Sequence, residues 1–133
     1  MAASKDQNPL WMLFVAHFAP CELIFQHYKQ TKTMFFDTRT QAEVGQAFIA
    51  YTHLWMALLF VVAEAFKELK LNDPTITPLI DQHLDDLRVF RNSVFHFQKD
   101  DRKRAQFHDV NKFNWAQQLH VAFQRYFEAQ ENA

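Results

Sequence analysis

The scarcity of glycine most constrains how this chain can fold. Its 133 residues include one glycine, Gly45, and four prolines. A β-rich domain needs a turn about every 8–12 residues, and glycine supplies the backbone conformations of many tight turns. A few long helices need far fewer turns. The sequence therefore predicts an all-α fold, and its length predicts a single domain over residues 1–133.

Apolar residues recur at helical spacing in four stretches. The first covers about residues 9–28, and Pro20 is expected to break or kink it. Longer helices are predicted over about residues 40–71 and 77–97, and a last one begins at about Asp109 or Asn114 and ends near Glu128. The polar residues 29–39 are predicted to form a loop, and residues 71–78, which contain Asp73-Pro74, a turn.

Charge and cysteine content narrow the functional classes. The formal net charge of −1 provides no global positive field to attract nucleic acid, so contact with RNA would need a local basic patch. The lone Cys21 excludes an internal disulfide and is consistent with a reducing compartment. The longest apolar run, residues 54–63, is shorter than the roughly 20 residues that span a bilayer. We expect a soluble, cytoplasmic protein that does not enter a membrane.

The segment Arg91-Asn-Ser-Val-Phe-His96 is the strongest candidate for chemistry. Arg91 lies in the middle of an apolar helical stripe, and a buried cation is costly unless something pairs with it. Glu64, beside apolar neighbours in the long helix, is the candidate partner, although a solvent-exposed Glu64 remains the alternative. Asn92 and His96 are four residues apart and share a second helix face. The apolar residues around Arg91 are Ile80, Leu84, Leu87, Val94 and Phe95.

Two interpretations of this segment stay open. An arginine on such a stripe can simply pair with a carboxylate inside a bundle, and a helix histidine more often packs than catalyses. Because Arg91 and His96 point to different faces, they can cooperate only on a ligand or another chain that reaches both. A locally basic connector follows His96, and its cations are candidates for contacts with an RNA backbone, although such runs are usually solvated loops. These cations are Lys99, Arg102, Lys103 and Arg104.

Several common catalytic motifs are absent from the sequence. One glycine cannot build a P-loop or a dinucleotide-binding loop, and there is no nucleophile elbow, no H-E-x-x-H and no cysteine pair. His17 and Cys21 are four residues apart, but Pro20 lies between them and no second cysteine exists. The sequence therefore predicts neither a cofactor nor a metal site.

The order Arg, Asn, three residues and His, late in a helix of a small all-α domain, resembles the HEPN superfamily. Arg91, Asn92 and His96 match that family's Arg-x4-His motif, and residues 51–74 together with 91–98 look like a stand-alone bacterial or phage subfamily. The resemblance covers about two thirds of the chain. It implies an up-and-down four-helix core and a homodimer in which two motif helices meet.

For active members, the resemblance implies metal-independent RNA cleavage in toxins or anti-phage defence, with an antitoxin or another protein as a candidate partner. His96 would move protons, Arg91 would stabilise charge on the phosphate, and Asn92 would orient the phosphate or the histidine. Glu64 is a candidate supporting residue. Other members are inactive, so a silent helical dimer that binds a protein or a nucleotide is the alternative function. A purely structural bundle, with Arg91 and Glu64 as a buried pair, is a third.

Overall fold

The computed structural model describes residues 8–38, 42–95 and 113–131, and it is an all-α bundle without a strand in these ranges. This confirms the predicted fold class. The helical elements are α1 (Pro9–Met12), a π-helical segment η2 (Leu13–Phe18), α2 (Ala19–Thr38), α3 (Ala42–Glu68), α4 (Ile76–Phe95) and α6 (Asn114–Glu131).

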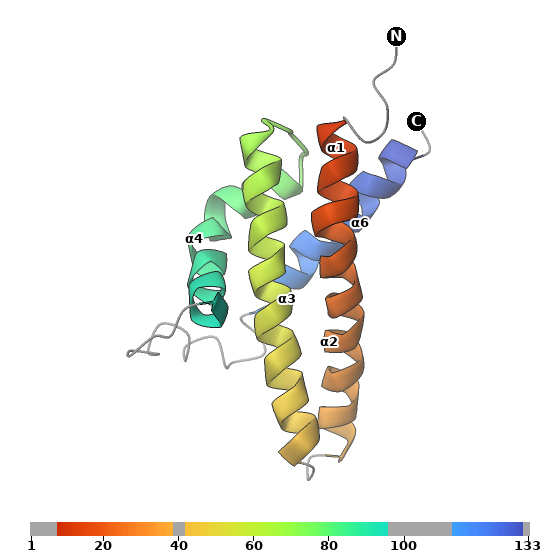
Figure 1. Ribbon diagram of the computed structural model, residues 1–133, viewed down its shortest axis with the longest axis vertical. Coiled ribbons are helices and arrows are strands. Elements are labelled where there is room, and N and C mark those ends of the chain that lie inside the picture. Colours follow the sequence, from red (N-terminus) through yellow and green to blue (C-terminus); the bar gives the residue numbers. More distant parts are fainter. Residues whose placement is uncertain (1–7, 39–41, 96–112, 132–133) are drawn as a thin grey trace.

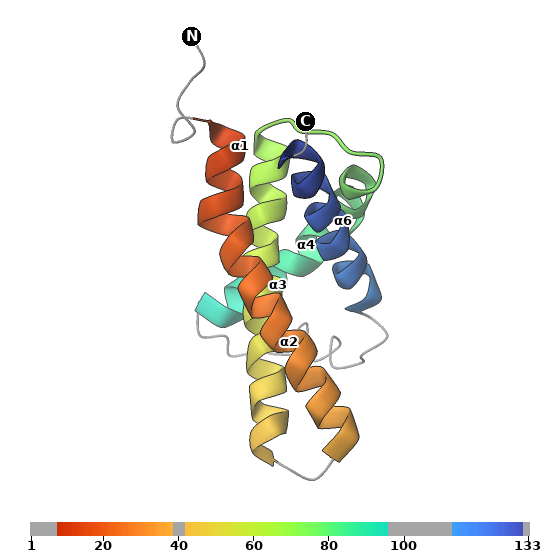
Figure 2. The same ribbon diagram turned by 90° about the vertical axis from the view of Figure 1, so that its right-hand side faces the viewer.

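The long antiparallel pair α2 and α3 is the axis of the bundle. Figure 1 shows α3 between α2 and α4, with α6 behind them, and α3 contacts both α2 and α4 extensively. In Figure 2, α4 crosses α3 obliquely, and α4 and α6 cover only one half of the α2/α3 pair. The other half projects as a helical hairpin whose two members pack mainly on each other.

Pro20 was predicted to break or kink the first helical run, and the structure shows an irregular but unbroken helix at this place. The chain is helical from Pro9 to Thr38, and the irregularity is the π-helical segment Leu13–Phe18 just before the proline. Proline donates no backbone hydrogen bond and its ring crowds the preceding turn. A widened turn relieves that crowding without ending the helix. It also directs both Leu13 and Phe18, five residues apart, into the core, where they are 2% and 3% exposed.

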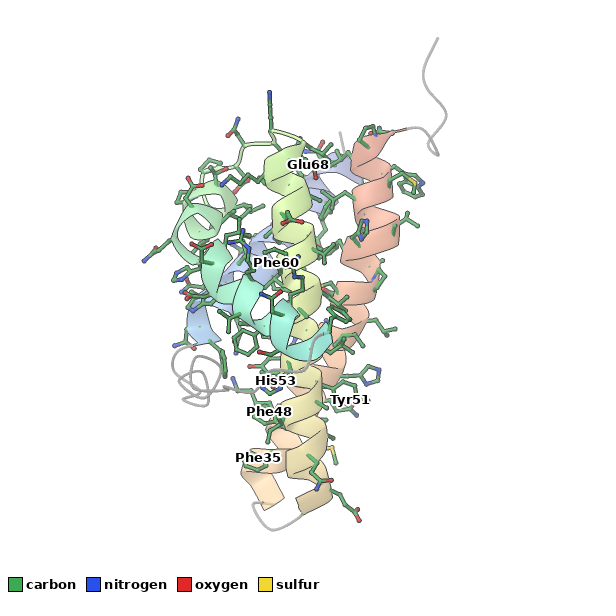
Figure 3. The ribbon with its side chains drawn as sticks, turned by 60° about the vertical axis from the view of Figure 1, so that its left-hand side comes forward. Phe35, Phe48, Tyr51, His53, Phe60 and Glu68 are labelled. Atoms are coloured by element: carbon green, nitrogen blue, oxygen red, sulfur yellow. The ribbon has the colours of Figure 1, made fainter. Side chains whose placement is uncertain are left out.

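The predicted loop over residues 29–39 is also wrong, because α2 continues through Thr38. Two kinds of contact stabilise this polar segment as a helix. The hydroxyls of Thr31 and Thr33 donate to backbone carbonyls one turn earlier, and Phe35 stacks on Phe48 of α3 at 5.4 Å between ring centroids (Figure 3). The packing of the hairpin thus extends a helix that propensity alone does not predict.

The turn between α3 and α4 agrees with the prediction. Lys70 adopts a left-handed backbone conformation with φ of 57° after α3 ends, and the Leu71 amide bonds back to the Phe66 carbonyl at 3.2 Å. The Asp73 carboxylate then accepts from the amides of Thr75 and Ile76, both at 2.9 Å, and so caps the start of α4. These contacts satisfy backbone groups at the α3 end and the α4 start.

One continuous aromatic core joins the helices. Trp55, Phe60 and Phe66 of α3 meet Tyr28 of α2, Phe90 of α4 and Phe123 of α6, and all six are at most 1% exposed. Many of the phenylalanine side chains are therefore used to build this core. The apolar middle of α3 is largely buried, as its sequence predicts.

By length and composition alone, the stretches Pro9–Phe35 and Glu43–Glu68 could each cross a membrane. Half of the apolar window in the second stretch is buried in the bundle, as in the core helix of a soluble protein. The first stretch lies near the N-terminus. Such stretches are only a weak indication of a membrane location.

Candidate functional site

Arg91 and Asn92 lie on the last turns of α4, where it crosses α3. The Arg91 guanidinium lies over the ring of Phe60, 4.7 Å from the ring centroid, and Phe60 is fully buried. Figure 3 labels Phe60 in the middle of α3. The Nε and Nη2 atoms of Arg91 donate hydrogen bonds to the side-chain oxygen of Asn92 at 3.2 and 2.9 Å. A cation over an aromatic face is stabilised by the negative charge of the ring face. The half-buried arginine is therefore held on two sides.

Among the described residues, no carboxylate forms an ion pair or hydrogen bond with Arg91. The neighbouring Arg88 differs, because it pairs with Asp85 three residues earlier and lies 5.7 Å from the Phe60 centroid. The Asn92 oxygen neutralises no charge. Arg91 thus remains an oriented guanidinium whose charge is uncompensated by these parts of the chain. Planar bidentate recognition of a phosphate or a carboxylate is the chemistry that such a group performs best.

The expected pairing of Glu64 with Arg91 is wrong within the chain. Glu64 is exposed on α3, and in the described ranges its carboxylate makes no hydrogen bond or ion pair. The prediction failed because the apolar neighbours of Glu64 suggested burial all round α3. The bundle instead packs α2, α4 and α6 around α3 and leaves Glu64 and Glu68 exposed. Glu68 is labelled near the end of α3 in Figure 3. A pairing of Glu64 with a second chain stays a prediction.

The remaining predicted site residues lie outside the described residues. These are His96 and the four basic residues Lys99, Arg102, Lys103 and Arg104. The structure thus brings Arg91 and Asn92 together, excludes Glu64 from their contacts and leaves the position of His96 relative to them as a prediction.

A buried polar cluster that sequence reasoning missed joins α2, α3 and α6. His120 of α6 is fully buried, and its Nδ1 accepts a hydrogen bond from the Trp55 indole N–H at 3.0 Å. Its Nε2 lies 2.6 Å from a carboxylate oxygen of Glu22. An indole N–H can only donate, so Nδ1 must be unprotonated and the Nε2–H donates to Glu22. Phe25 stacks on the imidazole with centroids 3.8 Å apart.

The ionisation of this cluster follows from its surroundings. Burial lowers the pKa of His120, and the hydrogen bond to Glu22 offsets only part of that effect. Burial alone would raise the pKa of Glu22, but hydrogen bonds from Gln124, His120 and Gln26 outweigh it, so the pKa is lowered. The cluster is therefore a neutral imidazole against an ionised carboxylate at neutral pH.

Cysteine, histidine and glutamate side chains meet here, yet the arrangement does not suit nucleophilic catalysis. The Cys21 thiol is fully buried, and burial together with the nearby Glu22 charge raises its pKa, whereas a reactive thiol needs a lowered one. Its sulfur is 3.9 Å from His120 Nδ1, a nitrogen already bonded to Trp55. The cluster thus fastens three helices together. No sequence pattern points to it, because Glu22 and His120 are 98 positions apart.

In the described ranges, no group of three or more histidine, cysteine or acidic side chains is arranged to hold a metal ion. A groove of about 450 Å³ between α2 and α6 is lined by Lys29, Lys32, Gln117 and Gln124, and a second of about 800 Å³ follows α6 past Asp73 and Arg125. Neither groove includes Arg91 or Asn92. Arg91 and Asn92 are partly exposed on α4, and within the described ranges they lie apart from both grooves.

Comparisons with protein-family models, with curated proteins and with solved structures found no match for this chain.

Proposed function

We propose that the protein is a metal-independent endoribonuclease whose site combines Arg91, Asn92 and His96 in a homodimer. The proposal rests on the orientation and charge of Arg91. Phe60 and Asn92 hold its guanidinium in place, and no carboxylate among the described residues neutralises it. A preorganised cation stabilises negative charge without having to reorganise during the reaction. The HEPN-like spacing of the three residues supplies the reaction class.

The chemistry needs only these side chains and the RNA itself. The ribose 2′-hydroxyl loses its proton to a base and attacks the adjacent phosphorus. The bond from phosphorus to the 5′-oxygen breaks, and that oxygen takes up a proton, which leaves a 2′,3′-cyclic phosphate and a free 5′-hydroxyl. His96 serves the proton transfers, and Arg91 stabilises the charge on the non-bridging oxygens. Asn92 keeps the guanidinium oriented and offers its amide N–H groups to the phosphate.

By their helical spacing, Arg91 and His96 point to different faces of one helix. If two α4 helices pair, Arg91 of one chain and His96 of the other can reach the same phosphate. Phe95, on the final turn of α4, is 57% exposed and gives this end of the helix an apolar contact for a second copy. A cytoplasmic toxin or defence nuclease, restrained by an antitoxin or another protein, is the biological setting that the HEPN resemblance suggests.

A silent helical dimer that binds a protein or a nucleotide is the second candidate. It is favoured by the exposure of Glu64, which removes the expected supporting carboxylate from the same chain, and by the overall charge of −1. This alternative keeps the Arg91 surface but uses it only to bind. The two functions differ in whether the phosphate ester is cleaved.

Expression in a bacterial host separates the two candidates. The wild-type protein should slow growth and fragment cellular RNA, and Arg91→Ala and His96→Ala should do neither while accumulating to the same level. Arg88→Ala is the matched control, because Arg88 lies on the same helix and against the same ring but is paired with Asp85. Intact RNA and normal growth with the wild-type protein, or equal toxicity of all variants, would reject the nuclease proposal.

A further inference from the structure

An apolar stripe runs along the outer side of the first helical run. We define this outer stripe as Met12, Val15, Ala16, Ala19 and Leu23. All five are exposed, and the three larger side chains are 46%, 44% and 60% accessible for Met12, Val15 and Leu23. The opposite side of the same run is buried in the core through Leu13, Phe18, Cys21 and Phe25. The stripe is therefore not part of the core of a single chain.

The segment from Pro9 to Cys21, which carries most of the outer stripe, has no permanently charged side chain, and its one titratable side chain on the surface is the exposed His17. The next residue, Glu22, turns inward to His120. Only 22% of the apolar window in the stretch Pro9–Phe35 is buried, compared with 50% for the corresponding window in α3. A helix that faced water would carry polar residues on its outer side. Contiguous exposed apolar surface of this kind marks an interaction site.

We propose that the outer stripe is the contact between two copies of this chain, related by a two-fold axis. Four of the five stripe residues have an order that supports a self-complementary contact, because large, small, small and large residues stand at Met12, Ala16, Ala19 and Leu23. Read from either end, this order is the same. An antiparallel pairing therefore places Met12 opposite Leu23 of the second copy and Ala16 opposite Ala19. The fifth residue, Val15, would lie opposite Pro20, which is also exposed.

The physical terms agree with this pairing. Small residues at the centre let two helices approach closely, while the larger side chains at each end fill the space beside them. Because the stripe is uncharged, bringing two identical surfaces together causes no like-charge repulsion. A two-fold contact uses the same surface on both copies, so that surface must be complementary to itself. A palindromic order of side chains meets this condition.

This contact is independent of the proposed nuclease site. α3 lies between α2 and α4, so the outer stripe and the end of α4 are on different sides of the bundle (Figure 1). Pairing through the stripe therefore adds one association step to any pairing through α4. Loss of the stripe contact would leave the nuclease site residues in place. An assay of RNA cleavage therefore distinguishes failure of the stripe proposal from failure of the nuclease proposal.

Light scattering of the full chain at micromolar concentration tests the proposal. The double variant Ala16→Glu/Ala19→Glu places like charges across the axis, and its mass should fall to half that of the wild type. The control Ala50→Glu/Ala129→Glu puts the same two changes on exposed positions of α3 and α6 and should keep the wild-type mass. A monomeric wild type, or a charged stripe variant with the wild-type mass, would overturn the proposal.

Cysteine cross-linking tests the pairing without disturbing the stripe's charge. A mixture of Met12→Cys and Leu23→Cys proteins should form a covalent dimer under mild oxidation much faster than either protein alone. The native Cys21 is buried and should not contribute. Replacement of one component by Ala129→Cys should abolish the reaction. Equal cross-linking in all mixtures would contradict the antiparallel pairing, and stripe-dependent binding to neutral phospholipid vesicles by a monomer would assign the stripe to a lipid surface instead.

Discussion

At the scale of single residues, His120 shows how a polar group can be fully buried in an aromatic core. Its two ring nitrogens have different partners, a donor in Trp55 and an acceptor in Glu22, so one neutral tautomer satisfies both. The same arrangement fixes the orientation of the Trp55 indole. His120 of α6 thereby links Trp55 of α3 to Glu22 of α2.

Trp55→Phe should therefore destabilise the protein by about 1–3 kcal/mol, because it leaves the buried His120 Nδ1 without a donor. Trp115→Phe is the matched control, since Trp115 is half-buried, stacks on His83 and makes no indole hydrogen bond within the described ranges. Urea unfolding measures both. Equal losses for the two variants would mean that ring volume, and not the hydrogen bond, is what matters at Trp55.

The same cluster predicts that the fold weakens in acid. The pKa values of both His120 and Glu22 are lowered in the folded protein, so unfolding allows each group to take up a proton more readily. Their stabilisation is complete above the ordinary pKa of histidine, about 6.5, and declines as the pH falls below it.

The urea midpoint should therefore decrease from pH 7.5 to pH 5. The double variant Glu22→Gln/His120→Gln should lose part of that slope, because neither replacement side chain titrates. An unchanged midpoint for the wild type over this range would contradict the assigned ionisation states.

At the scale of elements, the hairpin of α2 and α3 shows what periodicity can and cannot predict. The apolar stripe of α3 predicted a long buried helix, and the structure has it over Ala42–Glu68. The polar composition of residues 29–39 predicted a loop, yet the contact of Phe35 with Phe48 holds the end of α2 in a helix. That contact joins two helices and cannot be read from either one.

Gly45 lies inside α3, where glycine costs helix stability relative to alanine. A Cβ atom added there would lie 3.4 Å from the Phe35 ring, an ordinary contact distance. Gly45→Ala should thus stabilise the protein by about 0.5–1 kcal/mol. Ala50→Gly, at an exposed position of the same helix, should destabilise it by a similar amount, and thermal unfolding compares the two. A destabilised Gly45→Ala would show that Phe35 cannot give way.

At the scale of the whole molecule, the sequence predicted the all-α class, the four helical stretches and the turn at Asp73-Pro74 because each depends on local pattern. It placed Arg91 and Asn92 on one helix for the same reason. It failed at Glu64, because which side of α3 stays open depends on where α2, α4 and α6 pack. It missed the contact between Glu22 and His120, because that contact exists only once the first and last helices are side by side.

The most direct test of the central claim is cleavage of single-stranded RNA by the purified protein in EDTA. The account predicts products that end in a 2′,3′-cyclic phosphate. It also predicts a rate about 10²-fold lower or more for Arg91→Ala and for His96→Ala, with Arg88→Ala close to the wild type. Absence of cleavage over a broad panel of RNAs, or activity that survives both substitutions, would contradict it.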